Sequence, residues 1–253
     1  MNKPIYINNQ AILRILTMKL NLKVFFLNEL LIGFLVVLVS THAQATGMQP
    51  ETTVVILNES DGEASINIKN TDPNAALLYS SIESIPEDTE TLVVLTPPVA
   101  RVEAGETQLV RIIKQSSRPI KVQRLKRVIF EGIKQNNLDP SSAKIGVTVR
   151  QNLPLIIHPA GLLRNHEPWK LLKWSVQANQ LMVTNDSPYV VRLAQMVKVL
   201  PSGINIDLGR VYILPGETIT PSAKVKTSST RTVRISPATV YGFSVDQYDA
   251  ALQ

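Results

Sequence analysis

Residues 144–158 read KIGVTVRQNLPLIIH, and this stretch decides the fold because its apolar residues recur with the two-residue period of a β-strand. The polar Gln151 separates two apolar triplets, which are Ile145, Val147 and Val149, then Leu153, Leu155 and Ile157. A strand of this length spans about 45 Å, which is longer than a sandwich domain needs for its own core. Either the whole strand is buried in its own domain, or the first triplet fills the core of another protein.

The first 45 residues have the organisation of a secretory signal. Lysines precede an apolar run at 30–39, and Ala43-Gln44-Ala45 supplies the small residues of a cleavage site. We expect cleavage after Ala45, and a translation start at Met18 because the residues before it have no signal character. The alternative is a membrane anchor, although the uninterrupted apolar run has only about half the length that spans a bilayer.

Composition limits the class of protein. The first 45 residues carry four basic residues and one acidic residue, so their removal lowers the formal charge from +6 to +3. The remaining Lys and Arg are scattered and are not interleaved with stacking aromatics, which argues against binding to nucleic acid. The chain has no cysteine. An exported protein without disulfides depends on its hydrophobic cores, which suits two domains of about 100 residues each.

Short apolar runs separated by turn residues are typical of β-sandwiches, and no stretch shows a convincing helical period. In addition to the strand at 144–157, we expect strands at Thr53–Leu57, Ala64–Lys69, Leu77–Ser84, Thr107–Lys114, Arg127–Lys134, Leu172–Gln177, Gln180–Thr184, Val190–Lys198, Arg210–Ile213 and Thr230–Ile235. Pro159 and Gly161 interrupt strand pairing. We therefore predict an N-terminal domain at 46–160 and a C-terminal domain at 161–253, with a cleft between them.

Several short motifs follow one another along the two predicted domains. They are TPP at 96–98 with GETQLVRI at 105–112, LIIHPA at 155–160, LMVTNDSPY at 181–189 and LPG at 214–216. Each motif alone is weak, because Pro and Gly recur in any β-sandwich. Together and in this order, behind a signal sequence, they resemble the PapD-like periplasmic chaperones of the chaperone/usher pilus-assembly pathway.

This resemblance implies an all-β fold of two immunoglobulin-like sandwiches in an L-shaped arrangement, without a cofactor or a metal. It also implies pilus or fimbrial subunits and an outer-membrane usher as partners. In the family, the chaperone lends its seventh strand to a subunit that lacks the last strand of its own sandwich. The aligned donor residues are Ile145, Val147 and Val149, whereas the second triplet continues into the chaperone's own core.

The chain departs from the family at two charged positions. The family anchors the terminal carboxylate of the subunit with an Arg on the first strand and a Lys near the end of the seventh. The first position falls at Thr53 or Val54 and the second at Pro154, so neither cation is present. The candidate substitutes are Arg111, Lys114 and Arg150. The alternative for each is a solvated charge on a strand.

Two other classes of function compete with a chaperone. An enzyme is disfavoured because only His158 and His166 remain after cleavage, and no nucleophile, phosphate-loop or paired-histidine motif occurs. We interpret His158, at a strand end, as structural. A secreted β-sandwich adhesin or a structural pilus component remains the main alternative to a chaperone. An exposed apolar strand edge also favours self-association, so we expect a homodimer in which two copies cover each other's edge.

The exported form is predicted to begin near Thr46, because the small residues at 43–45 follow the apolar run. Mass spectrometry of a periplasmic extract measures the mature mass directly. A mature mass that still includes residues 30–39 would show an anchored protein instead.

Overall fold

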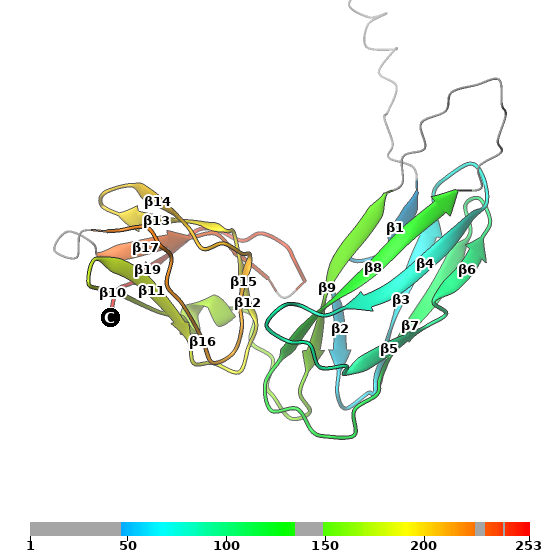
Figure 1. Cartoon of the computed structure of the whole chain (residues 1–253), viewed down its shortest axis with the longest axis horizontal. Coiled ribbons are helices and arrows are strands. Elements are labelled where there is room, and N and C mark those ends of the chain that lie inside the picture. Colours follow the sequence, from blue (N-terminus) through cyan, green and yellow to red (C-terminus); the bar gives the residue numbers. More distant parts are fainter. Residues whose placement is uncertain (1–46, 135–148, 226–230, 240) are drawn as a thin grey trace, which may run out of the picture. The chain divides into compact units, whose positions relative to one another are not determined.

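The computed structural model shows an all-β protein (Figure 1) and describes residues 47–134, 149–225, 231–239 and 241–253. Residues from Thr46 onward form one compact unit. Within it, strands before and after His158 surround two separate hydrophobic cores. The predicted class, two β-sandwiches, is confirmed. The predicted signal sequence lies outside the described residues.

The first sandwich consists of two sheets with strand orders β1-β3-β7-β5 and β2-β9-β8-β4-β6. Apolar side chains that alternate along the strands fill the space between the sheets, as the period of two requires. The strands are β1 (Met48–Pro50), β2 (Val55–Asn58), β3 (Glu63–Asn70), β4 (Ala76–Glu83), β5 (Val93–Thr96), β6 (Val99–Val102), β7 (Thr107–Lys114), β8 (Arg124–Lys134) and β9 (Arg150–His158).

Strand β9 carries the second apolar triplet into the core of this sandwich. Leu153, Leu155 and Ile157 are at most 6% exposed and belong to the core cluster, as predicted. Burial of each such side chain stabilises the fold by about 1.5–3 kcal/mol. Strand β9 pairs antiparallel with β8 and parallel with β2, and the second pairing runs only from Leu155 to His158.

The second sandwich is built from short strands in sheets β10-β11-β16, β15-β12-β18 and β14-β13-β17-β19. Its core surrounds the fully buried Trp174. A 3-10 helix, Pro168–Leu171, precedes it. The strands are β10 (Lys173–Gln177), β11 (Gln180–Asn185), β12 (Val191–Leu193), β13 (Met196–Leu200), β14 (Ile204–Asp207), β15 (Tyr212–Ile213), β16 (Glu217–Ile219), β17 (Thr232–Ile235), β18 (Pro237–Ala238) and β19 (Tyr248–Ala251).

The Asn-x-Ser-Pro-Tyr motif has a structural explanation. Asn185 is fully buried, and its amide donates to the carbonyl oxygens of Tyr189, at 2.8 Å, and Ile213, at 3.1 Å. Its Oδ1 accepts from the backbone N–H of Ser187, at 3.2 Å, and from the Ser187 hydroxyl, at 2.6 Å. A buried amide needs partners of this kind, so the motif fixes the turn that follows β11.

One predicted strand is wrong as a single element. The segment 190–198 divides into β12 and β13, which belong to different sheets, with Ala194 and Gln195 between them. The predicted first strand likewise begins later, at Val55, after β1 has paired with β3 in the opposite sheet. Alternation alone does not show where a chain passes from one sheet to the other, because the side-chain pattern continues through the crossing.

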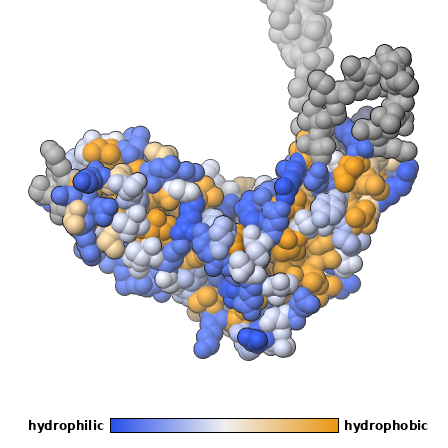
Figure 2. Space-filling view, in the orientation of Figure 1, coloured by the Kyte–Doolittle hydropathy of each residue, from blue (hydrophilic) through white to orange (hydrophobic). Residues whose placement is uncertain are grey.

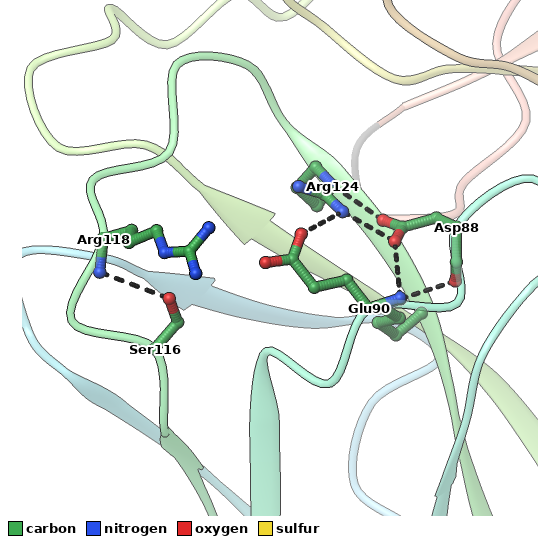
Figure 3. Close-up of polar contacts among 6 residues, drawn as sticks. Asp88, Glu90, Ser116, Arg118 and Arg124 are labelled. Carbon is green, nitrogen blue, oxygen red and sulfur yellow. Dashed lines mark hydrogen bonds and ion pairs between the residues drawn. The ribbon is translucent and has the colours of Figure 1, made fainter.

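A buried ion pair holds the loop between β4 and β5 (Figure 3). The side chain of Lys126 is 1% exposed, and its Nζ donates to Asp88 Oδ1, at 2.8 Å, and to the Asp88 carbonyl oxygen, at 2.6 Å. Arg124 donates to both carboxylate oxygens of Asp88, at 2.6 Å each, and to Glu90 at 3.0 Å. Burial opposes the charged form of Asp88, but the hydrogen bonds and charges of Arg124 and Lys126 outweigh it. The pKa of Asp88 is therefore below its ordinary value of 3.8.

We expect Asp88→Asn to lower the free energy of unfolding at pH 7 by about 3 kcal/mol, because it leaves the buried ammonium of Lys126 without its counter-charge. A lowered folded-state pKa stabilises the protein above the unfolded pKa, and this contribution is lost as the pH falls through the folded value. The difference between variant and wild type should therefore shrink below about pH 4. Urea denaturation at pH 7 and pH 3 measures it.

The matched control is Glu90→Gln, since Glu90 meets Arg124 at the surface with its side chain 49% exposed. Its effect should stay below about 1 kcal/mol. Equal losses for Asp88→Asn at both pH values would contradict an electrostatic role for this carboxylate.

Candidate functional site

Strand β9 has an open edge between Arg150 and Pro154. Strand β8 pairs with this segment on one side, whereas β2 begins to pair on the other side only at Leu155. In the part of the chain that the structure describes, residues 150–154 pair with no strand on that second side. Such an edge offers backbone N–H and C=O groups to another polypeptide. Pro154 lies at its end, and a proline is tolerated in a strand at an edge of this kind.

Val149 precedes the open edge directly and is 41% exposed. It is the member of the predicted donor triplet that the structure describes, and its side chain is not part of the core of its own sandwich. Ile145 and Val147 lie outside the described residues. Val149 and the second triplet therefore differ in burial, since the second triplet is buried and Val149 is half-exposed.

The three candidate cations each have an acidic partner. Arg111 on β7 is paired with Glu63, and Arg150 on β9 with Glu83. Lys114 on β7 meets Glu59 at 2.8 Å, and these two side chains are only 13% and 8% exposed. Burial opposes ionisation of Glu59, but Lys114 and the backbone N–H groups of Ile120 and Ala160 keep its pKa below its ordinary value. The structure does not bring these three cations together.

An apolar cluster lies on the sheet face of β9 that is turned away from the core. It joins the first sandwich to Val190 of the second half of the chain, and its buried members are Val54, Ile85, Leu125, Ile156 and Val190. Burial in this cluster explains why Ile156 is apolar although it alternates with the core residues.

Gln123 and His158 complete this contact between the two halves. The Gln123 side chain donates to His158 Nδ1, at 2.9 Å, and accepts from the Val190 N–H, at 2.8 Å. His158 Nε2 lies 2.9 Å from the carbonyl oxygen of Leu162. With Gln123 as donor, Nδ1 is the acceptor and Nε2 carries the proton, so both ring nitrogens are occupied. These contacts support the structural interpretation of His158.

The first sandwich also exposes apolar side chains on the outer face of β4, β6 and β8 (Figure 2). They form two cross-strand pairs, Leu77 opposite Ile133 and Tyr79 opposite Val99, and each is at least 40% exposed. An exposed apolar patch of this kind is typical of a surface that binds another protein.

Sequence reasoning did not single out two arginines, one of which lies beside the open edge and the other near Thr53. Arg127 on β8 is opposite Pro154, and its guanidinium donates to the side-chain and backbone oxygens of Asn152. Arg192 on β12 lies beside Gly242, since a Cβ at Gly242 would be 3.3 Å from Arg192 Nη1 and 3.0 Å from Thr53 Oγ1. Their signal in the sequence is weak, because an Arg in an alternating strand usually faces solvent.

A cavity of about 240 Å³ lies next to His158, and its lining contains no carboxylate, thiol or Ser/Thr hydroxyl. Among the described residues, no group of His, Cys, Asp and Glu could hold a metal ion. In the same part of the chain, no helix has the length and apolar character to cross a membrane.

Comparison with known proteins gives the same result for both halves of the chain. Residues 47–163 match the family "Pili and flagellar-assembly chaperone, PapD N-terminal domain", and residues 167–248 match "Pili assembly chaperone PapD, C-terminal domain". The Escherichia coli (strain K12) fimbrial chaperone YhcA is 43% identical over 210 residues, which cover 83% of this chain and 92% of that protein.

Solved structures share the fold at lower sequence identity. The Salmonella enterica chaperone SafB, solved in complex with the SafA pilin, gives a TM-score of 0.67 at 20% identity, covering 83% of this chain and 98% of that one. The Escherichia coli chaperone DraB gives 0.66 at 20% identity, covering 83% and 100%. On the evidence of its two matched domains and its 43% identical relative, the chain belongs to the PapD-type fimbrial chaperones of the chaperone-usher pathway.

Proposed function

We propose that this protein is a periplasmic chaperone that stabilises pilus or fimbrial subunits by donor-strand complementation and delivers them to an outer-membrane usher. In this proposal Ile145, Val147 and Val149 insert into the open groove of a subunit, while the subunit pairs with the free edge of β9. The observation that carries it is the open edge at 150–154 directly after the half-exposed Val149.

The energetics suit a complex that is strong and still exchangeable. Three apolar side chains buried in a partner contribute about 1.5–3 kcal/mol each, and the edge adds backbone hydrogen bonds. An incoming strand that offers the same contacts can replace the chaperone without a nucleotide. Thr148 and Arg150 alternate with the donor residues, so they point away from the groove.

Other features support the remaining parts of the proposal. The predicted signal sequence supports a periplasmic location. The exposed pairs of Leu77 with Ile133 and Tyr79 with Val99 offer a second surface for a protein partner such as the usher. We expect no catalytic activity.

The alternative, an adhesin or a structural pilus component, would be favoured by self-assembly or by sugar binding. Stacking on a sugar needs exposed aromatic faces. Trp169 and Trp174 are the two tryptophans of the chain, and they are only 5% and 0% exposed.

Val147→Asp is expected to abolish co-purification with a pilus subunit, because a carboxylate in an apolar groove costs several kcal/mol unless it finds a partner. A subunit gene that neighbours the chaperone gene provides the client for co-expression. Val149→Asp should act in the same way and leave the circular dichroism unchanged, since Val149 is half-exposed in the free protein.

Two matched controls separate binding from folding. Thr148→Asp, on the opposite face of the same segment, should be far milder. Leu155→Asp should unfold the protein, because Leu155 is completely buried in its own core. If Val147→Asp unfolds the protein as Leu155→Asp does, the first triplet is buried in the core of its own sandwich and the donor-strand proposal is wrong.

The free chaperone is expected to form dimers through the donor triplet, because two copies can cover each other's exposed edge. Analytical ultracentrifugation over a range of concentrations should show a monomer–dimer equilibrium that a bound subunit reverses and that Val149→Asp weakens. A strictly monomeric protein at high concentration would count against the dimer, although not against the binding of subunits.

A further inference from the structure

We propose that the polar contact between the two halves of the chain is a pH-sensitive switch, which holds while His158 is neutral and loosens when the His158 ring takes up a second proton. The proposal rests on a series of hydrogen bonds that runs from the Val190 N–H through the side chains of Gln123 and His158 to the Leu162 carbonyl oxygen. It concerns the free protein, so it does not depend on the proposed function.

The two ends of this series are backbone groups whose roles cannot change. The Val190 N–H can only donate, so the Gln123 atom that lies 2.8 Å from it is Oε1. Gln123 Nε2 therefore faces His158 Nδ1, at 2.9 Å, and donates to it. At the other end the Leu162 carbonyl oxygen can only accept, so His158 Nε2, 2.9 Å away, carries the ring proton. Both ends therefore require the same neutral tautomer of His158.

A second ring proton has no acceptor in this series. Both nitrogens of a charged histidine are donors, so the Nδ1–H of His158 would point at the amide N–H of Gln123. If the Gln123 amide turns over, its Oε1 accepts from His158, but its Nε2 then faces the N–H of Val190. Two donors oppose each other in either orientation. All three residues are buried, and a buried donor without an acceptor disfavours the docked state about tenfold or more.

Protonation breaks the contact on one side of the ring only. His158 Nε2 still donates to Leu162 when the ring is charged, and the Tyr189 hydroxyl holds the next carbonyl oxygen, that of Leu163, at 2.7 Å. The contact that is lost lies between Gln123 of the first sandwich and Val190 of the second. The apolar cluster that contains Val190 does not titrate. Acid therefore loosens the docking of the two sandwiches and does not unfold them.

The surroundings of the ring do not favour its charge. The titratable and charged groups on the neighbouring elements are Glu59, Asp61, Arg124, Arg164, His166 and Tyr241. The two acids already accept hydrogen bonds from other groups, and Arg124 is paired with Asp88. The cavity next to His158 is lined by Arg164 and His166 and by no carboxylate. A second ring proton would thus join two cationic groups without gaining an acidic partner there.

The direction of the pH dependence follows from this arrangement. An ordinary histidine becomes charged below about pH 6.5. The docked arrangement excludes the second proton of His158, whereas the released ring can accept it from solvent. The released state therefore binds more protons, and its population rises as the pH falls. The contribution of this contact to docking is present above about pH 6.5 and is lost below it.

Amide hydrogen exchange of the mature protein, followed by NMR at about pH 7.5 and about pH 5.5, tests the switch. The protection factor of the Val190 N–H, taken relative to an unstructured chain at the same pH, should fall about tenfold or more in acid. The Leu193 N–H, which donates to the Val211 carbonyl oxygen at 3.2 Å within the second sandwich, should keep its protection. Equal protection of Val190 at both pH values would overturn the proposal.

A matched pair of variants separates the two histidines that follow residue 45. His158→Asn removes the titrating ring and keeps an amide oxygen that can accept from Gln123, so the pH response of Val190 should disappear. His166→Asn changes the exposed histidine at the same cavity and should leave the response intact. A response that survives in His158→Asn, or that is lost in His166→Asn, overturns the assignment to His158.

Gln123→Glu tests the conflict between donors directly, and it keeps the test decisive should His158→Asn fail to fold. A carboxylate has no N–H, so it can accept from Val190 and from a charged His158 at the same time. In this variant the charged ring completes the series. Val190 should therefore be better protected at about pH 5.5 than at about pH 7.5, the reverse of the wild type. The same direction in variant and wild type would contradict the proposed mechanism.

Discussion

The parallel pairing of β2 with β9 stops at Leu155, and the rest of the structure depends on this limit. Beyond it, β9 has partners on both sides and its inward side chains fill the core. Before it, the strand keeps β8 on one side and pairs on its other side with no strand of the described residues. One strand therefore stabilises its own sandwich and presents an edge to another chain, because a strand has two edges as well as two faces.

Charge is distributed around this strand in two different ways. The cluster of Asp88, Arg124 and Lys126 pairs a carboxylate with two cations and fixes a loop of the first sandwich. Arg192 differs, because its buried Nη1 has no hydrogen-bond partner among the residues that the structure describes. A buried cationic group without a partner costs stability.

Residue patterns were sufficient for the features that depend on local alternation. The second triplet of β9 is buried as its spacing predicts, and the Asn-x-Ser-Pro-Tyr motif folds back on itself within five residues.

Residue patterns were not sufficient where segments distant in the sequence meet. The passage of the chain between sheets at Ala194 and Gln195 leaves no trace in the alternation. Nor could the sequence show that Arg192, 65 positions after Arg127, interacts with it, because that proximity depends on the docking of the two sandwiches. The predicted donor residues Ile145 and Val147 lie outside the described residues and stay a prediction.

The open edge has a consequence for the range of clients. Its hydrogen-bonding groups are those of the backbone, which every polypeptide shares, and the segment from Arg150 to Pro154 offers them over a fixed, short length. Recognition through such an edge depends on an unfilled strand position in the client and on the register of its chain end, and hardly on the identity of its side chains. If the proposed function holds, one chaperone of this design can therefore serve several subunits of divergent sequence, and the depth and shape of the subunit groove then determine which of them it binds.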